Sequence, residues 1–243
     1  MFGPNRPGVR VVRSVCRRAG YDVVRYDGRF LAWWRRELFG RQQVRLVIDV
    51  GANAGQTGQA LRAEGYAGRI VSFEPSSTAF ASLEKAARSD PLWAAERAAV
   101  GSRDATITLN LSRNSKSSSV LPILDAHMRA DSESRYVGTE TVALRRLDFF
   151  REALALSGQP SLLKIDVQGY EHEVVAGAGE TLTTVRAVEC ELSIAALYDG
   201  QSGMNEMIET LRDRGFIPVA LNAAFSDRST KELLQVNGMF VKR

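Results

Sequence analysis

The chain has 243 residues, of which 44% are hydrophobic and 25% are charged, and its formal net charge at pH 7 is +4. The composition is that of an ordinary globular protein, and the length suits one complete α/β domain. No apolar run is long enough to cross a bilayer, and the first residues lack the apolar core of a signal peptide, so we expect a cytoplasmic protein without a transmembrane segment. The two cysteines, Cys16 and Cys190, form no metal-binding or disulfide motif.

The positive charge is concentrated at the start of the chain. Residues 1–45 contain eleven arginines and three acids, a balance of +8, so the remaining residues carry −4. We therefore predict a basic, helical N-terminal extension over residues 1–45 and one domain over residues 46–243. Such an extension would meet nucleic acid, anionic lipid or a phosphorylated substrate, or it is a solvated arginine-rich face. Phe30, Trp33 and Trp34 among the arginines would suit a substrate lid, a membrane-surface helix or a dimer contact.

From residue 46 onward, strand-like and helix-like segments alternate, which predicts a mostly parallel sheet with helices on both faces. Strands are expected at 46–50, 69–73, 95–100, 162–167, 187–192, 216–221 and 234–241, and helices at 57–64, 78–88, 147–156, 170–178 and 205–214. Segments 105–111 and 140–144 alternate with period two and would pair as an antiparallel insertion, whereas the polar stretch 112–119 predicts a mobile loop. The last two strands follow each other without a helix, so the final strand should run antiparallel.

The strongest motif is a buried strand that runs into the loop Asp49–Gly55 and then into a helix. Its small residues let a ligand approach the backbone, and the helix N-terminus favours a negative group. No third glycine completes the G-x-G-x-x-G pattern of a dinucleotide site. Glu74 ends the second strand about 20 residues further on, where a carboxylate binds the ribose hydroxyls of a nucleoside; the alternative is a helix N-terminal or surface acid. The residues expected to bind the cofactor are Asp49, Gly51, Ala52, Asn53, Gly55, Gln56, Glu74, Pro75, Ser76, Val100, Asn114 and Asp166.

Five segments of the sequence resemble the FkbM family of methyltransferases. They are VIDVGANAGQ (47–56), SFEPS (72–76), NSKSSS (114–119), LLKIDVQGYEHEVVAGA (162–178) and the closing NGMFVKR (237–243). The resemblance implies a class I methyltransferase, Rossmann-like fold with a seven-stranded sheet, and S-adenosylmethionine (SAM) as the cofactor. It also implies O-methylation of a hydroxyl group on a glycan, a glycolipid or another natural product. At the position of Gln168 the family usually has Glu, so this chain departs from the pattern there.

In an open parallel sheet, ligands lie at the carboxyl ends of the strands, where Asp166 and Glu191 are expected. Methyl transfer to an alcohol needs a group that removes the proton. Three mechanisms are open: Asp166 acts as the base, His172 acts as the base, or Asp166 and Glu191 hold Mg²⁺ or another divalent cation. Alternatively, Asp166 caps a helix or pairs with Lys164, and His172 is an exposed helix residue. The loop 114–119 would close over the cofactor and acceptor, or it is a solvated linker.

Two other functions compete with a small-molecule or glycan O-methyltransferase. A nucleic-acid methyltransferase, acting on RNA for example, is favoured by the basic N-terminus, but the chain has neither an Asn-Pro-Pro-Tyr motif nor a catalytic Pro-Cys pair. A non-catalytic protein could use the same fold to bind a partner, because fold does not fix function. We expect a small-molecule or glycan acceptor, no nucleic acid, and membrane-surface contact through the basic N-terminus.

Overall fold

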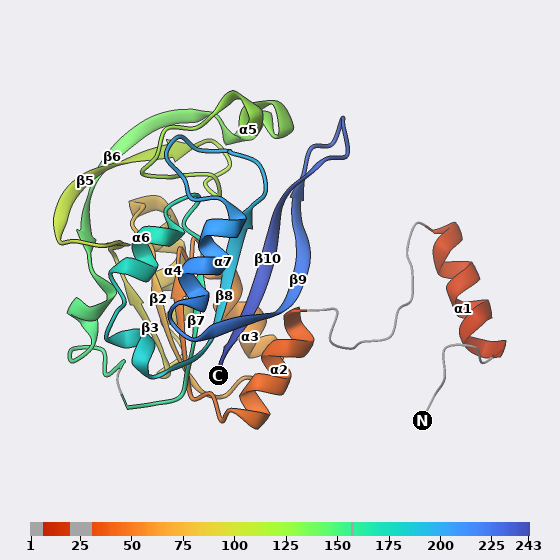
Figure 1. The fold of residues 1–243 in the computed structure, drawn as a ribbon, viewed down its shortest axis with the longest axis horizontal. Helices are drawn as coiled ribbons and strands as arrows, with labels where there is room; N and C mark the ends of the chain where they lie inside the picture. Colours follow the sequence, from red (N-terminus) through yellow and green to blue (C-terminus); the bar gives the residue numbers. More distant parts are fainter. Residues whose placement is uncertain (1–6, 20–30, 157) are drawn as a thin grey trace.

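The computed structural model describes residues 7–19, 31–156 and 158–243 (Figure 1). Its α-helices are α1 (Pro7–Arg18), α2 (Leu31–Arg41), α3 (Gln56–Ala63), α4 (Ser77–Ala87), α5 (Asp125–Ala130), α6 (Glu171–Ala176) and α7 (Met204–Arg212), with short 3-10 turns at Ser132–Ser134, Leu147–Phe150 and Thr181–Thr183. Its strands are β1 (Leu46–Val50), β2 (Arg69–Phe73), β3 (Trp93–Glu96), β4 (Ala99–Val100), β5 (Ala105–Ser112), β6 (Tyr136–Arg145), β7 (Ser161–Ile165), β8 (Val185–Ser193), β9 (Phe216–Ser226) and β10 (Leu233–Lys242). Within the described ranges, no helix has the length and apolar character needed to cross a membrane.

The central sheet has seven strands in the order β3-β2-β1-β7-β8-β10-β9. The first five are parallel, and β10 is inserted antiparallel between β8 and β9. The order reverses direction between β1 and β7, and such a switch point is where open α/β sheets bind ligands. This topology confirms the predicted Rossmann-like sheet, and it confirms that the last strand is antiparallel.

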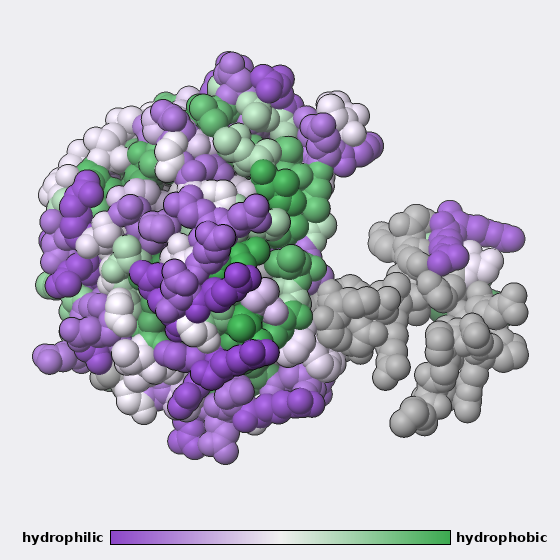
Figure 2. Space-filling view, viewed as in Figure 1, coloured by the Kyte–Doolittle hydropathy of each residue, from purple (hydrophilic) through white to green (hydrophobic). Residues whose placement is uncertain are grey.

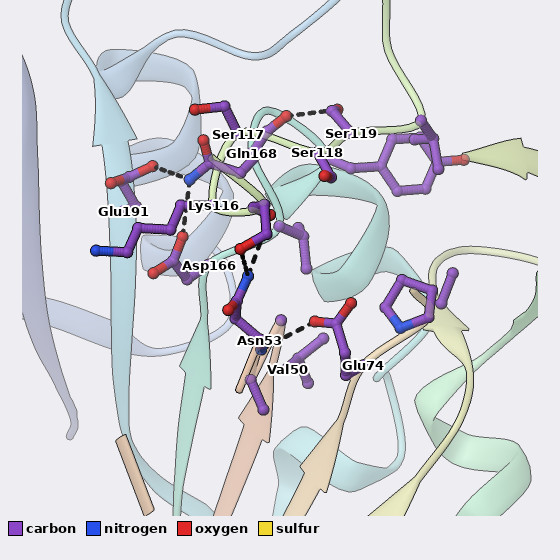
Figure 3. Close-up of a pocket in the computed structure, with 18 of the residues that line it drawn as sticks. Val50, Asn53, Glu74, Lys116, Ser117, Ser118, Ser119, Asp166, Gln168 and Glu191 are labelled. Atoms are coloured by element: carbon purple, nitrogen blue, oxygen red, sulfur yellow. Dashed lines mark hydrogen bonds between the residues drawn. The ribbon is translucent and has the colours of Figure 1, made fainter. Parts of the chain in front are cut away.

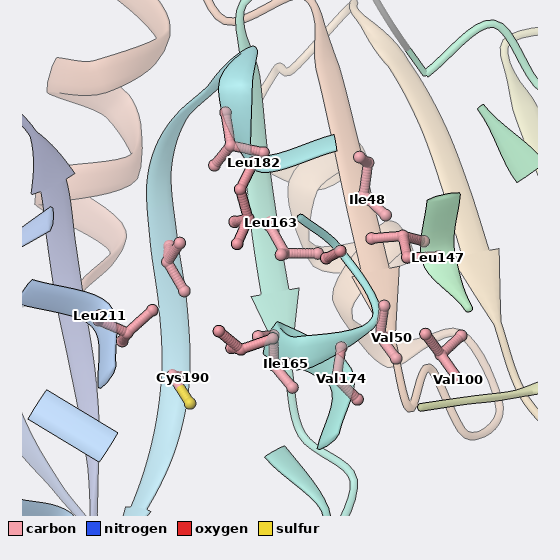
Figure 4. Close-up of a cluster of buried hydrophobic side chains, with 14 of the residues drawn as sticks. Ile48, Val50, Val100, Leu147, Leu163, Ile165, Val174, Leu182, Cys190 and Leu211 are labelled. Carbon is pink, nitrogen blue, oxygen red and sulfur yellow. The ribbon is translucent and has the colours of Figure 1, made fainter. Parts of the chain in front are cut away.

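Strand residues alternate between two hydrophobic layers, as the period of two requires. Ile48, Val50, Leu163 and Ile165 face the layer formed with α6 and α7 (Figure 4). Their neighbours in sequence, such as Val47 and Leu162, face α2, α3 and α4. Helices therefore cover both faces of the sheet, and the buried central strands hold the loops at their carboxyl ends in place.

A second, three-stranded sheet has the order β4-β6-β5. Its antiparallel β5–β6 pair confirms the pairing predicted for segments 105–111 and 140–144, with longer strands than the sequence indicated. The single strand predicted over 95–100 is wrong. The chain leaves the central sheet after Glu96, turns with the Ala98 N–H donating to the Glu96 carbonyl, and enters the small sheet as β4.

The helix predicted over 147–156 is also wrong, because only Leu147–Phe150 forms a 3-10 turn there. The carboxylate of Asp148 accepts hydrogen bonds from the backbone N–H groups of Glu180 and Thr181 and from the Thr181 hydroxyl. These tertiary bonds, with burial of Phe150 and Leu156 in the core, outweigh the local helical pattern.

Part of the segment predicted as an extension packs against the domain. In α2, Leu38 is buried in the core, and the Arg35 guanidinium binds both carboxylate oxygens of Glu189 at 2.5 and 2.6 Å. Pro7–Arg18 forms the helix α1, whereas Phe30 lies outside the described residues.

The surface is mixed in polarity, but apolar side chains gather along the edge formed by β10 and β9 (Figure 2). Leu221 on β9 is 50% exposed there. At the upper end of the same strand, Phe225 lines the cavity described next.

Candidate active site

A cavity of about 420 Å³ opens at the carboxyl ends of β1, β2, β7 and β8 (Figure 3). Its volume falls in the range of about 300–1,000 Å³ that is typical of small-molecule sites. Of the expected residues, those that line it are Gly51, Ala52, Asn53, Gln56, Glu74, Pro75, Val100, Asn114, Asp166 and Glu191. Asp49, Gly55, Ser76 and His172 do not line it. Most of the expected residues thus lie around one cavity, and their binding of a cofactor stays a prediction.

Gly51 begins the loop after β1 in a conformation that requires glycine. Its φ is +82°, and a Cβ atom there would lie 1.8 Å from the carbonyl oxygen of Asp166. The Gly51 and Ala52 N–H groups both donate to the Phe73 carbonyl, which joins the ends of β1 and β2. Gly51 thus lets the loop after β1 pack directly against the backbone of Asp166, and the approach of a ligand to this loop stays a prediction.

Glu74 is held in place by its own neighbours. One carboxylate oxygen accepts the Asn53 N–H and the other accepts the Ser76 N–H, each at 2.9 Å. Burial raises the pKa of Glu74 to about 7, although these two hydrogen bonds oppose the shift. Each oxygen keeps a lone pair for a ligand, so the carboxylate is arranged to accept hydrogen bonds from a pair of hydroxyls.

The wall beside Glu74 is apolar. It is formed by Pro75, by residues 98–100 and by Leu109 of the small sheet. Val100, which the sequence analysis expects to bind the cofactor, is part of this wall. A carboxylate next to an apolar slot suits a ribose joined to a flat base.

The ammonium group of Lys164 lies between the carboxylates of Asp49 and Asp166. Its Nζ is 3.5 Å from Asp49 Oδ1 and 3.3 Å from Asp166 Oδ2. Burial opposes the charge of Lys164, but the carboxylates of Asp166 and Asp49 raise its pKa above the usual value. Burial also raises the pKa of Asp49, and Lys164 opposes that rise. Asp49 does not line the cavity, but it fixes the position of Lys164, which does. The ion pair between Lys164 and Asp166, an alternative that the sequence analysis gave, is present in the structure.

Gln168 bridges the two carboxylates predicted to act together. Its Nε2 donates to Asp166 Oδ1 at 2.9 Å and to Glu191 Oε2 at 3.0 Å, while its Oε1 accepts the Tyr198 hydroxyl at 2.8 Å. Gln235 Nε2 donates to the same Glu191 oxygen at 2.7 Å. Burial, followed by the charges of Asp166 and Glu171, raises the pKa of Glu191 well above its usual value.

Glu171 fixes the loop that carries Asp166 and Gln168. One of its carboxylate oxygens accepts the N–H groups of Val167 and Gly169 at 3.0 and 3.2 Å. Burial raises the pKa of this carboxyl to about 7, although the same backbone bonds oppose the rise. Glu171, the last residue of the segment KIDVQGYE (164–171), therefore has a structural role in holding this loop. The sequence analysis did not assign that role.

The serine-rich loop closes one side of the cavity, and its packing contradicts the solvated-linker alternative. The Asn114 side chain accepts from Ser112 Oγ and Ser117 N–H and donates to Ser117 Oγ and Asp131. Ser117 and Ser119 are buried, and the Ser119 hydroxyl donates to the Gln168 carbonyl (Figure 3). Asn114 thus organises the loop, and its predicted mobility stays a prediction.

Of the two histidines, His127 lines the cavity and His172 does not. His172 on α6 is half-buried and away from the cavity lining. His127 on α5, which the sequence reasoning did not select, is 3% exposed and lines the cavity, and burial lowers its pKa to about 4. Its Nδ1 finds no hydrogen-bond partner among the residues that the structure describes. Nothing local marks His127, because long-range folding brings it to the site.

SAM and a divalent cation, the two ligands that the sequence analysis expects, fit the residues of this cavity differently. The paired acceptor oxygens of Glu74 and the apolar wall suit the adenosine part of SAM. For a cation, the described residues contain no group of three or more His, Cys, Asp or Glu side chains arranged to hold one. A side-chain N–H of Gln168 points at both Asp166 and Glu191, so this arrangement does not favour a bridging cation.

Comparison with known proteins finds a family model and a relative that match parts of this chain. The model of the methyltransferase FkbM domain matches residues 49–218. A 2-O-methyltransferase, NoeI of Sinorhizobium fredii, is 38% identical over 77 residues, which is 32% of this chain and 31% of that protein. The match to this relative thus spans about a third of its length.

Matches among solved structures include TehB from Haemophilus influenzae, with a TM-score of 0.47 and 9% identity over 93% of this chain and 65% of that one. Another is the fibrillarin of Aeropyrum pernix with natively bound SAM, with a TM-score of 0.46 and 14% identity over 82% of this chain and 66% of that one. The strand order itself is that of a class I methyltransferase. Since the FkbM model spans both the loop after β1 and the Asp166 loop, the chain belongs to the FkbM family of SAM-dependent methyltransferases.

Proposed function

We propose that this enzyme transfers the methyl group of SAM to a hydroxyl oxygen of a carbohydrate-like acceptor, such as a glycan, a glycolipid or a polyhydroxylated natural product. The observation that carries the proposal is the polar part of the cavity lining, which includes Asp166, Gln168, Glu191, Lys116 and His127. Side chains of this kind suit an acceptor with several hydroxyl groups, each needing a hydrogen-bond partner. The 2-O-methyltransferase activity named for the relative from Sinorhizobium fredii supports the same class of reaction.

In this proposal Asp166 is the base. When bound, SAM supplies a methyl group activated by its sulfonium charge. Asp166 Oδ2 or Oδ1 accepts the proton of the acceptor hydroxyl as the new O–C bond forms and the C–S bond breaks, which leaves S-adenosylhomocysteine (SAH). Lys164 and Gln168 orient the Asp166 carboxylate through their bonds at 3.3 and 2.9 Å. The side chain of Asp166 is 36% exposed, so it can reach an acceptor while its partners keep it fixed.

Glu191 and His127 have supporting roles toward the acceptor. The raised pKa of Glu191 favours its neutral form, which can donate a hydrogen bond as well as accept one. The lowered pKa of His127 keeps its ring neutral at pH 7, so the ring adds no charge to the acceptor end of the cavity. Neither residue needs to change its protonation state during methyl transfer.

The experiment compares wild type with Asp166→Asn for SAH binding by calorimetry and for transfer of labelled methyl groups to a panel of methyl glycosides. We expect kcat to fall by about 100-fold or more, because a positioned base contributes on the order of 10² to 10⁴ in rate. SAH affinity should change far less, since the variant keeps an oxygen for Gln168 and a similar shape. Equal kcat in the two proteins would exclude Asp166 as the base.

Two further arms of the experiment test the alternatives. With direct proton transfer to Asp166, activity should persist in EDTA, and a loss restored by Mg²⁺ would instead support the cation on Asp166 and Glu191. Methylation of an RNA pool, with none of the glycosides, would overturn the proposed acceptor class. In that case SAH binding would be intact, so the failure would concern the acceptor and not the cofactor site.

A further inference from the structure

The helix α1 exposes apolar side chains that no part of the described domain covers. Val11, Val12 and Val15 are 63%, 52% and 61% exposed. Single exposed apolar residues are common on protein surfaces, but three within one short helix form a patch. The patch therefore requires an explanation other than packing against the domain.

The apolar residues of α1 lie on one side of the helix. At 3.6 residues per turn, Val11, Val12, Val15 and Cys16 fall within an arc of about 140°. Arg17 projects from the opposite side, and Arg18 lies at the boundary of the arc. The helix sequence PGVRVVRSVCRR contains four arginines and no acidic residue. The helix thus has an apolar face and a positively charged face.

The positive charge and the apolar face of α1 together indicate which kind of partner it binds. A nucleic acid would pair with the arginines but leave the three valines in water. A bilayer with anionic headgroups satisfies both faces, because the valines enter the boundary of the acyl chains while the arginines stay at the phosphates. The long arginine side chains can reach the headgroups from the edge of the apolar arc.

We propose that α1 is a membrane-surface helix that binds anionic bilayers through its valine face and its arginines. The helix is only 12 residues long, about 18 Å, so it lies along the surface and does not cross it. Isolated helices of this length are marginal in water, and burial of the valine face stabilises the helix on the membrane. This binding is independent of methyl transfer and holds whatever the acceptor is.

The test uses the full chain and two kinds of vesicle in a flotation assay. One kind contains phosphatidylcholine with phosphatidylglycerol, and the other contains phosphatidylcholine alone. We expect binding to the first kind, weakened by added salt, and little binding to the second. Equal binding to both kinds would overturn the proposed role of the arginines.

Two variants test the apolar face and the charged face of α1 one at a time, and each variant has a matched control. Val11→Asp with Val15→Asp should weaken binding by roughly tenfold or more, since it removes the apolar area that enters the bilayer. Val137→Asp, at a valine on β6 that is 60% exposed, is its control and should bind as wild type. Arg18→Gln should weaken binding about fivefold, whereas Arg228→Gln in the β9–β10 turn should not.

SAH affinity, measured on every variant, reports whether the domain is folded, and we expect it to be unchanged. Unweakened vesicle binding by the double valine variant would overturn the proposal. So would salt-sensitive binding of an RNA oligonucleotide by a protein that binds neither kind of vesicle.

Discussion

Glu74 shows how one residue can be located from sequence while its chemistry depends on the fold. Its place after β2 is a local feature, and the sequence predicted a nucleoside contact there. The raised pKa could not be predicted, because it comes from burial behind the loops of β1 and β2. The hydrogen bonds from Asn53 and Ser76 keep the carboxylate oriented, so the residue is preorganised for a diol.

This geometry predicts how cofactor affinity depends on pH. Ribose hydroxyls donate to the ionised carboxylate, so the pKa of Glu74 should be lower in the SAH complex than the value of about 7 in the free protein. The free protein must therefore release a proton on binding below that pH. SAH affinity should rise by up to about tenfold per pH unit below 7 and be level above it. Calorimetry across this pH range measures the effect.

Glu74→Gln provides the control for that prediction. The amide keeps one acceptor oxygen but does not titrate, so we expect affinity about tenfold or more below wild type above pH 7 and a flat profile. A wild-type profile that is equally flat would show that Glu74 does not bind the nucleoside.

At the scale of elements, α2 is joined to the central sheet by a charge pair. Arg35 contacts Glu189 with two hydrogen bonds, and the Glu189 side chain is 5% exposed. Arg35→Met would leave this carboxylate buried without its partner, at a cost of about 3–5 kcal/mol in unfolding free energy. The double variant with Glu189→Gln should recover part of that loss. Urea denaturation of the four proteins of the cycle measures both effects.

A surface pair in the same helix is the matched control. Arg41 pairs with Glu37, and its side chain is 78% exposed, so Arg41→Met should cost less than about 1 kcal/mol. If Arg35→Met costs no more than Arg41→Met, the pair does not anchor α2 to β8.

The sequence predicted helices and strands correctly where their hydrophobic pattern matched the surroundings that the fold gives them. The strand Leu46–Val50 is buried on both faces and reads as a continuous apolar run. The segment 147–156 has a helical pattern, but Asp148 bonds to Glu180 and Thr181 across the fold. The packing of α2 depends on Glu189, which lies 154 residues from Arg35 in the chain. Contacts at such separations leave no periodic signal in a single sequence.

At the scale of the molecule, the site joins segments from most of the domain. Loops after β1, β2 and β7 meet the serine-rich loop, α5 and β10 around one cavity. The sequence predicted the loops that carry motifs, whereas His127 and Gln235 came to the site only through the folded topology. A ligand that touches all these segments can bind only the folded state, so its binding energy adds to global stability.

This linkage predicts a thermal shift that also tests the site. At about 100 times its dissociation constant, SAH should stabilise the domain by about 2.7 kcal/mol, which raises Tm by about 5–10 °C for a chain of this size. Glu74→Ala, if its affinity is tenfold lower, should gain about 1.4 kcal/mol at the same concentration and so about half the shift. Arg228→Gln, at a residue that does not line the cavity, should shift as wild type does. Differential scanning calorimetry distinguishes these cases, and an equal shift for Glu74→Ala and wild type would mean that the nucleoside does not depend on Glu74. A missing shift in all three proteins would contradict the cavity as the SAM site, because a ligand in contact with so many loops must stabilise the fold that brings them together.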